Sequence, residues 1–292
     1  MKIYEEDGID LAVLTLGITL FFEPRPCRVK EYSLLREAID IVSSHATWYR
    51  GGEMRRNASV ATNTIDVFHE YVYKAYEKTG ECFLFIDSGK TPDGVGQSAF
   101  KFACLSDPSS EILGYFQFNM PCDPLAVAAA QLSSLFNRCV DSSFFLHGYA
   151  GFSINFDHGD VNDDRDVAMR AYCERFLGVS LTDLLTESEQ LIHTIKGAQW
   201  LTFISDSLLQ QEEEQSQIVR SADGVSMTPN GILLKASDIP LLGDRHRQKD
   251  MQLYRRINAL LTPWLVETLY PMPGFPDEES VRSWLYRLRP EP

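Results

Sequence analysis

The sequence lacks the short motifs that mark the commonest catalytic sites. Gly89–Thr91 has the Gly-Lys-Thr end of a phosphate-binding loop, but Leu84 stands where that loop needs its first glycine. His69 and Glu70 could begin a zinc-binding helix, but Tyr73 stands where the second histidine should be. No Gly-x-Ser-x-Gly nucleophile motif is present. We therefore predict no catalytic residue, no metal and no cofactor, although active sites assembled from distant residues leave no local signature.

Cysteine pairs and long apolar runs are also missing. None of the six cysteines belongs to a Cys-x-x-Cys pair, so free thiols in a reducing compartment are expected. The apolar run at 11–22 is too short to span a bilayer, and acidic rather than basic residues precede it. These features predict a cytoplasmic protein with no export signal and no membrane contact.

Positive charge is scarce. The chain has 27 lysines and arginines against 41 aspartates and glutamates, which gives a net charge of −14. Binding to nucleic acid depends on cations that neutralise phosphates, so the composition argues against nucleic acid as a partner. An acidic surface instead attracts basic partners, although acidity can also serve solubility alone.

Strand and helix patterns alternate along the chain. Period-two patterns predict strands over 11–22, 82–87, 98–106, 113–121, 142–157 and 199–205, and a further pair within 212–238. Helical spacing predicts helices over 30–45, 64–80, 125–139, 167–176 and 250–261, and another that opens near Asp277. We expect an α+β fold with a mainly antiparallel sheet or sheets flanked by helices. Residues 1–292 are expected to form a single domain, with a second lobe from about 195–292 as the alternative.

An acidic stretch at 156–166, FDHGDVNDDRD, follows the strand predicted at 142–157. Counted from Asp160 as a calcium loop, its sixth position is Arg165 and its twelfth is Ala171, where glycine and glutamate are needed. This register argues against metal binding. We predict that Asp163 or Asp164 caps the helix at 167–176 and that the remaining carboxylates form an exposed acidic surface.

Three segments of the C-terminal third resemble a known family. They are QWLTFISDSLL at 199–209, GILLKASDIPLLGD at 231–244 and QLYRRINALLTPW at 252–264. Their order is similar to that of the type VI secretion immunity family, whose members are found beside antibacterial toxins. FNMP at 118–121 fits the same pattern, and the resemblance covers about residues 10–270.

The resemblance implies an immunity protein that binds one cognate secreted toxin and blocks it, with no catalysis of its own. From the charge argument, the toxin is expected to be a basic nuclease that acts in the cytoplasm. Trp200, Gly231, Leu242, Gly243 and Asp244 are then expected to shape turns and core. The toxin-binding candidates are acidic side chains expected on the surface: Asp157, Asp160, Asp163, Asp164, Asp166, Glu212, Glu213 and Glu214.

Two other classes of protein stay open. A small-molecule-binding domain or an enzyme could use His147 together with Asp157 and His158 to line a pocket at a strand end. The third class is a structural component that acts only by oligomerisation. A homo-oligomeric immunity protein is also left open.

Overall fold

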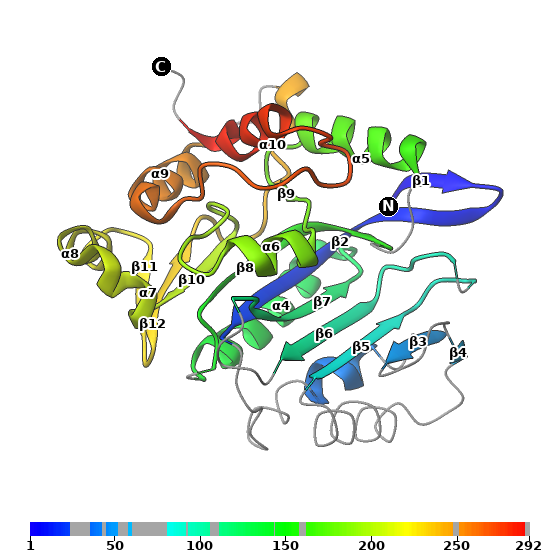
Figure 1. Cartoon of the computed structure of the whole chain (residues 1–292), viewed down its shortest axis with the longest axis horizontal. Helices are drawn as coiled ribbons and strands as arrows, with labels where there is room; N and C mark the ends of the chain where they lie inside the picture. Colours follow the sequence, from blue (N-terminus) through cyan, green and yellow to red (C-terminus); the bar gives the residue numbers. More distant parts are fainter. Residues whose placement is uncertain are drawn as a thin grey trace.

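An antiparallel β-sheet runs through most of the chain (Figure 1). The computed structural model describes residues 1–23, 36–42, 45–51, 58–59, 81–91, 93–105, 111–142, 144–157, 162–247 and 251–289. The sheet has twelve strands in these residues, in the order β11-β12-β10-β8-β2-β7-β6-β5-β3-β4, with β1 beside β2 and β9 beside β8. The strands are β1 (Lys2–Glu6), β2 (Ile9–Phe22), β3 (Trp48–Gly51), β4 (Ala58–Ser59), β5 (Glu81–Asp87), β6 (Ala99–Leu105), β7 (Gly114–Met120), β8 (His147–Phe156), β9 (Val179–Ser180), β10 (Leu201–Ser205), β11 (Val225–Thr228) and β12 (Gly231–Lys235).

The pairing confirms the predicted α+β class with a mainly antiparallel sheet. β5, β6 and β7 pair in sequence order as the expected meander, and only β8 with β9 is parallel among the described pairs. The strands of residues 201–235 continue this sheet, because β10 pairs with β8 and β12 pairs with β10. The first and last thirds of the chain therefore share one sheet.

The two faces of the sheet differ in polarity. β2 places Leu16, Ile18 and Leu20 on one face, and all three are fully buried. Successive side chains of a strand point to opposite faces, so Thr15 and Thr19 lie on the other face. Neighbouring strands add further buried polar side chains to that second face: Gln117, Asn119, Ser153 and Asn155. One face builds the apolar core, and the other buries polar groups.

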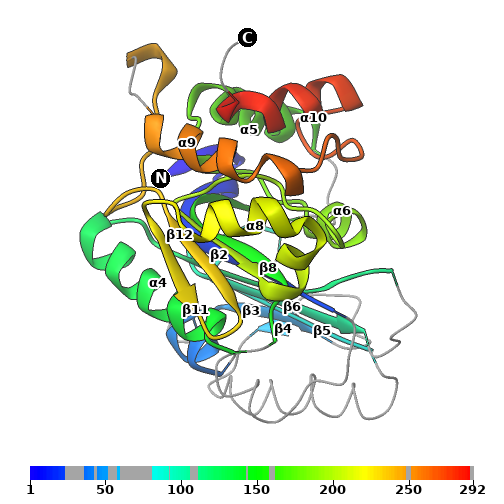
Figure 2. The same cartoon turned by 90° about the vertical axis from the view of Figure 1, so that its left-hand side faces the viewer.

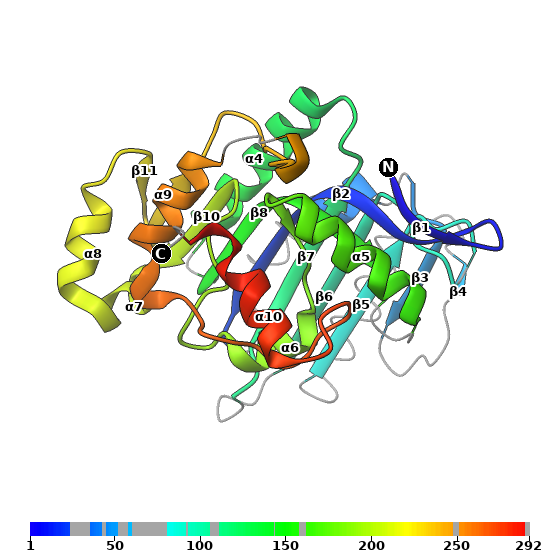
Figure 3. The ribbon, with the colours of Figure 1, turned by 90° about the horizontal axis from the view of Figure 1, so that it is seen from above.

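Helices cover both faces and one end of the sheet. They are α4 (Leu125–Val140), α5 (Asp163–Arg175), α6 (Leu184–Gln190), α7 (Asp206–Leu209), α8 (Glu213–Arg220), α9 (Gln252–Leu260) and α10 (Glu278–Leu285). The sheet lies between α4 and α6, while α5, α9 and α10 form a layer across its end (Figure 2). Seen from above, α7 and α8 lie far from α5 (Figure 3). No described helix is long and apolar enough to cross a bilayer.

The segment at 212–238 departs from its prediction. Its pattern predicts two strands joined by loops, whereas the structure begins this segment with the short helix α8 and places β11 and β12 after it. Helix formation suits the charges, because Glu213 and Glu214 lie in the first turn of α8 and Arg220 lies in its last. The predicted helix at 64–80 lies outside the described residues. For the helix predicted at 30–45, the structure describes residues 36–42 as helical.

The glycine that opens β12 is required by close backbone contact, which suits the turn-shaping role expected of it. A Cβ added at Gly231 would lie 2.1 Å from the backbone oxygen of Ile204. Gly151 in β8 provides a matched comparison, because an added Cβ there would meet Trp200 at an ordinary 3.5 Å.

We expect Gly231→Ala to lower the free energy of unfolding by about 1–3 kcal/mol, since the backbones of β12 and β10 must separate to admit the methyl group. Urea denaturation measures the loss. Gly151→Ala serves as the control and should cost clearly less. Equal losses at the two positions would contradict the proposed role of backbone contact.

Candidate functional site

His147 lies in the core. The residue is 1% exposed, its ring lies 5.0 Å from the ring of Phe21, and its Nε2 lies 2.9 Å from the backbone oxygen of Leu191. Burial lowers the pKa of His147 to about 4, so the imidazole is neutral at neutral pH. His158, its proposed partner, lies outside the described residues. The structure therefore gives His147 a core position rather than the predicted place in a binding pocket.

Metal ligands are not gathered in the described part of the chain. No group of three or more His, Cys, Asp or Glu side chains there could hold a metal ion. The Gly-Lys-Thr segment belongs instead to a turn that folds around Asp87 at the end of β5. The Asp87 Oδ1 accepts hydrogen bonds from the backbone of Gly89 (2.7 Å) and Gly96 (2.6 Å), and its Oδ2 accepts one from Asn155 (2.8 Å). Burial raises the pKa of Asp87 to about 6 despite these bonds.

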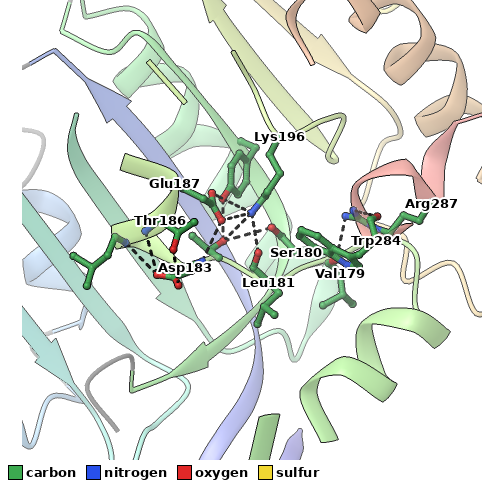
Figure 4. A network of polar contacts seen from close by, with 12 residues as sticks. Val179, Ser180, Leu181, Asp183, Thr186, Glu187, Lys196, Trp284 and Arg287 are labelled. Atoms are coloured by element: carbon green, nitrogen blue, oxygen red, sulfur yellow. Dashed lines mark hydrogen bonds and ion pairs between the residues drawn. The ribbon is translucent and has the colours of Figure 1, made fainter. Parts of the chain in front are cut away.

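A buried ion pair lies where α6 meets the polar face of the sheet (Figure 4). The Lys196 Nζ donates to Glu187 Oε1 at 2.7 Å, to the Tyr149 hydroxyl at 2.8 Å and to the Leu181 carbonyl at 2.9 Å. The Tyr149 hydroxyl donates in turn to Glu187 Oε2 at 2.7 Å. Every proton of the ammonium group thus has an acceptor.

This cluster resembles catalytic chemistry but has no access to substrate. The side chains of Lys196 and Glu187 are 1% and 0% exposed. Burial lowers the pKa of Lys196 and raises that of Glu187, while their mutual attraction opposes both changes. Neither residue lines a described pocket. The ion pair therefore holds the loop before β10 against α6 and β8.

The acidic stretch of residues 156–166 forms the exit of β8 and the start of α5. Asn162, rather than the predicted Asp163 or Asp164, caps α5: its Oδ1 accepts from the backbone N of Arg165 at 2.8 Å. The same side chain donates its Nδ2 to Glu6 Oε2 at 2.9 Å. An aspartate could not make this second bond, because its carboxylate has no proton to donate. The cap thus lies one residue earlier than predicted, and its side chain also ties the start of α5 to β1.

The candidates in this stretch are not equivalent. Asp163 and Asp164 are exposed in the first turn of α5. Asp166 is half-buried and accepts from the Nε and Nη2 of the buried Arg165 at 3.0 and 2.9 Å. The Arg165 Nη1 also donates to the Asp157 carbonyl at 3.1 Å, which ties the strand exit to the helix. Asp160 lies outside the described residues.

A second acidic segment lies beside the start of α5. It is not among the residues predicted from the sequence. β1 and β2 form a hairpin whose turn residues Asp7 and Gly8 both have positive φ angles, 50° and 81°. Burial, followed by the carboxylates of Glu6, Asp164 and Asp7, raises the pKa of Tyr4, because negative charges disfavour its ionisation. The hairpin and the helix thus share one surface. We call the exposed carboxylates of Glu6, Asp7, Asp163 and Asp164 the acidic end.

The acidic residues of α8 do not join this surface. Glu212, Glu213 and Glu214 are exposed, as predicted, but α8 lies at the opposite side of the molecule from the start of α5 (Figures 1 and 3). The candidate residues therefore form two separate regions. The sequence carried one signal for the missed hairpin, the Asp-Gly pair at residues 7–8, which favours a two-residue turn.

We expect Lys196→Met to lower the free energy of unfolding by about 3–5 kcal/mol, because it leaves the Glu187 carboxylate buried without a cation. A double variant that adds Glu187→Gln should recover at least about 1 kcal/mol, since it removes that uncompensated charge. Chemical denaturation of the two single variants and the double variant measures the coupling. Additive losses would show that the two groups do not act as a pair.

Lowering the pH should change the free energy of unfolding in opposite directions through His147 and Asp87. Below pH 6.5 the unfolded chain protonates His147 before the native chain does, so acidification to about pH 4 costs up to about 3 kcal/mol. Below pH 6 the native chain protonates Asp87 before the unfolded chain does. The same acidification therefore adds up to about 3 kcal/mol to the free energy of unfolding.

Stability measured between pH 7 and 4 therefore separates the two groups. Relative to the unmodified chain, His147→Gln should gain stability as pH falls, and Asp87→Asn should lose it. Parallel profiles for all three proteins would contradict these assignments.

Comparison with known proteins identifies the family. Residues 36–288 match the model of TsiV, described as type VI immunity for VRR-NUC. The fold is similar to that of the Pseudomonas aeruginosa T6SS protein PA0821, with a TM-score of 0.80, 19% sequence identity, and coverage of 100% of this chain and 86% of that one. No curated protein matches the sequence. The family match confirms the resemblance found in the C-terminal segments, and the chain belongs to the TsiV family of type VI immunity proteins for VRR-NUC.

Proposed function

We propose that the chain binds and neutralises one cognate VRR-NUC toxin by tight protein–protein association, without catalysis of its own. The family assignment supports the class of partner. A nuclease must approach polyanionic DNA or RNA, so the surface around its active site is expected to be basic. The acidic end offers that surface a complementary partner. Because nucleic acid is the target of such a toxin, we place the complex in the cytoplasm.

The single observation that carries this proposal is the assembly of the acidic end from two distant segments. Glu6 and Asp7 come from the β1–β2 hairpin, and Asp163 and Asp164 come from α5. The Asn162 bond to Glu6 fixes one segment against the other. Charges held in place on a partner's approach path raise the association rate and exclude wrong partners.

The other candidate residues take different places in this proposal. Asp157 is half-buried at the end of β8 and Asp166 is engaged by Arg165, so we propose for neither the exposed role of the acidic end. Asp160 lies in the short segment between β8 and α5, and we retain it as a candidate. Glu212, Glu213 and Glu214 lie outside this contact surface. We also propose that residues 1–292 act as one domain, because the shared sheet supports it.

We expect Asp163→Lys combined with Asp164→Lys to slow association with the toxin about tenfold at low salt and to weaken its salt dependence. Glu213→Lys combined with Glu214→Lys is the matched control, since it makes the same charge change in the first turn of α8. Stopped-flow binding to catalytically inactive toxin measures both rates, and thermal melts confirm that each variant is folded.

Neutralisation is tested separately, as loss of nucleic acid cleavage when the chain is added to active toxin in equimolar amount. Absence of any complex would overturn the proposed function. A complex whose association is slowed equally by the two variants would leave the function standing and remove the acidic end from the interface.

A further inference from the structure

A rigid turn lies against the far end of α5 from the acidic end. Gly243 adopts a φ of 66°, and an added Cβ there would lie 2.6 Å from the sulfur of Met251. The Gly243 carbonyl accepts from the backbone of Leu177 at 3.1 Å, and the Leu242 carbonyl accepts from that of Gly178 at 2.9 Å. The turn therefore cannot shift without breaking its contacts with the residues that follow α5.

Asp244 organises the cations that surround this turn. Its carboxylate accepts from the Nε and Nη2 of Arg175 at 3.2 and 2.9 Å and from the backbone N of His246 at 3.0 Å. The Arg175 guanidinium lowers the pKa of Asp244, and the carboxylate raises that of Arg175. The Arg245 Nη1 donates to the Glu174 carbonyl at 3.4 Å. These bonds fix the position of the 3₁₀ turn Arg245–Arg247 beside α5.

A groove of about 920 Å³ lies between this turn, α5 and β1. Its volume falls within the range of about 300–1,000 Å³ that is usual for ligand sites. Its lining combines apolar side chains from the start of the chain and from α5 with cations of α5 and the turn. The lining residues are Met1, Ile3, Ala168, Ala171, Tyr172, Glu174, Arg175, Phe176, Arg245 and His246.

The groove carries positive charge in a chain whose net charge is −14. Arg175 and Arg247 pair with the carboxylate of Asp244, and Arg245 lies next to Asp244 in the same turn. Glu174 is paired with Arg170 at 2.8 Å, so it neutralises little of this charge. The turn therefore presents an excess of positive charge at the mouth of an apolar groove.

Tyr172 contributes to the wall of the groove. Its ring packs 4.5 Å from that of Phe176, and its buried hydroxyl has no hydrogen-bond partner among the described residues. Burial raises the pKa of this hydroxyl, so it keeps its proton. Because the hydroxyl is closed to solvent, Tyr172 offers a ligand its ring rather than a hydrogen bond.

We propose that this groove receives an acidic segment of the partner toxin, with a carboxylate at Arg245 and an apolar side chain on the alanine-lined face of α5. The proposal rests on the proposed function, because it concerns the same partner. The groove adds a contact of opposite sign to the acidic end. α5 has thirteen residues, so the two contacts lie roughly 20 Å apart along one helix. Opposite charges at the two ends fix the orientation in which the toxin docks.

The alternative anion, nucleic acid, fits this surface less well. A nucleic acid strand carries a charge at every phosphate, so a strand in the groove would extend past neighbouring carboxylates. Glu174 borders the groove, and the acidic end lies at the other end of the same helix. A short acidic protein segment can contact the cations without meeting these carboxylates.

Two variants test the charge and the shape of the groove. Arg245→Glu reverses one rim charge and should raise the Kd for catalytically inactive toxin at least tenfold. Ala171→Trp fills the groove without changing charge, and should raise the Kd by a similar factor, since Ala171 is exposed and supports no core contact.

Each variant has a matched control on another helix. Arg256→Glu reverses an exposed charge on α9, and Ala130→Trp places the same bulky side chain at an exposed position of α4. Both should bind within about twofold of the unmodified chain. Calorimetry gives the Kd values, and thermal melts confirm that all four variants are folded.

Chemical coupling identifies the occupant. Arg245→Lys retains the charge and supplies a primary amine, which a water-soluble carbodiimide joins to a contacting carboxylate. Mass spectrometry of the treated complex should find position 245 linked to an Asp or Glu of the toxin, and no such link with the unmodified chain. Coupling only to Glu174 of the same chain would overturn the proposal.

The outcomes also separate this proposal from the proposed function. If the toxin binds and Arg245→Glu and Ala171→Trp behave as their controls do, the groove lies outside the interface while the immunity function stands. If no complex forms with the unmodified chain, the proposed function fails with it. If the unmodified chain retains a single-stranded oligonucleotide of twenty nucleotides and Arg245→Glu abolishes this, the groove is a nucleic acid site and the proposal is wrong.

Discussion

The antiparallel pairing of β2 with β8 is the constraint on which the rest of the molecule depends. It runs from Ala12 opposite Phe156 to Phe21 opposite His147. Because the strands run in opposite directions, the residues that enter β2 lie beside those that leave β8. The β1–β2 hairpin is therefore brought next to the start of α5, although about 150 residues of chain separate them. The acidic end is a consequence of strand register.

The same pairing sets the direction of α5 and thereby the position of the groove. α5 begins at the exit of β8 and ends where the turn at 242–244 docks on Leu177 and Gly178. One helix thus carries carboxylates in its first turn and Arg175 in its last, an order that also favours the helix dipole. A charge pattern that stabilises the helix supplies the two ends of the surface proposed to meet the toxin.

Much of the fold could be predicted from local patterns, because strands and helices with one buried face carry a clear period. The long strand at 11–22, the meander over 82–121 and the helix that opens at Asp277 follow this rule. Residues 212–220 did not, because α8 has only eight residues, and in so short a segment the apolar positions do not distinguish a helix from a strand. The cap of α5 lies one residue before the predicted position, and its side chain also donates to Glu6, which is distant in sequence.

The candidate site could be predicted only in part, for a similar reason. Composition indicated an acidic binding surface, and Asp163 and Asp164 are exposed as expected. Composition could not indicate which acidic segments meet, so it grouped the carboxylates of α8 with those of α5 and omitted the hairpin. Composition could not predict the buried pair of Lys196 and Glu187 either, since neither residue lies in a recognisable motif. Only the folded chain brings the Lys196 Nζ to 2.7 Å from the Glu187 Oε1. Family resemblance supplied the class of function, and tertiary structure supplied the surface that we propose for it.

The place of Met1 has a practical consequence. Its carbonyl accepts from the backbone of Leu14 at 2.8 Å, and its side chain lines the groove beside α5. A purification tag added ahead of Met1 would emerge at the mouth of this groove, where a polyhistidine or an acidic epitope would meet Arg245 and His246. Residue 289, near the other terminus, follows α10, whose neighbours do not line the groove. Fusion at the C-terminal side is accordingly the better arrangement for measuring how this protein meets its toxin.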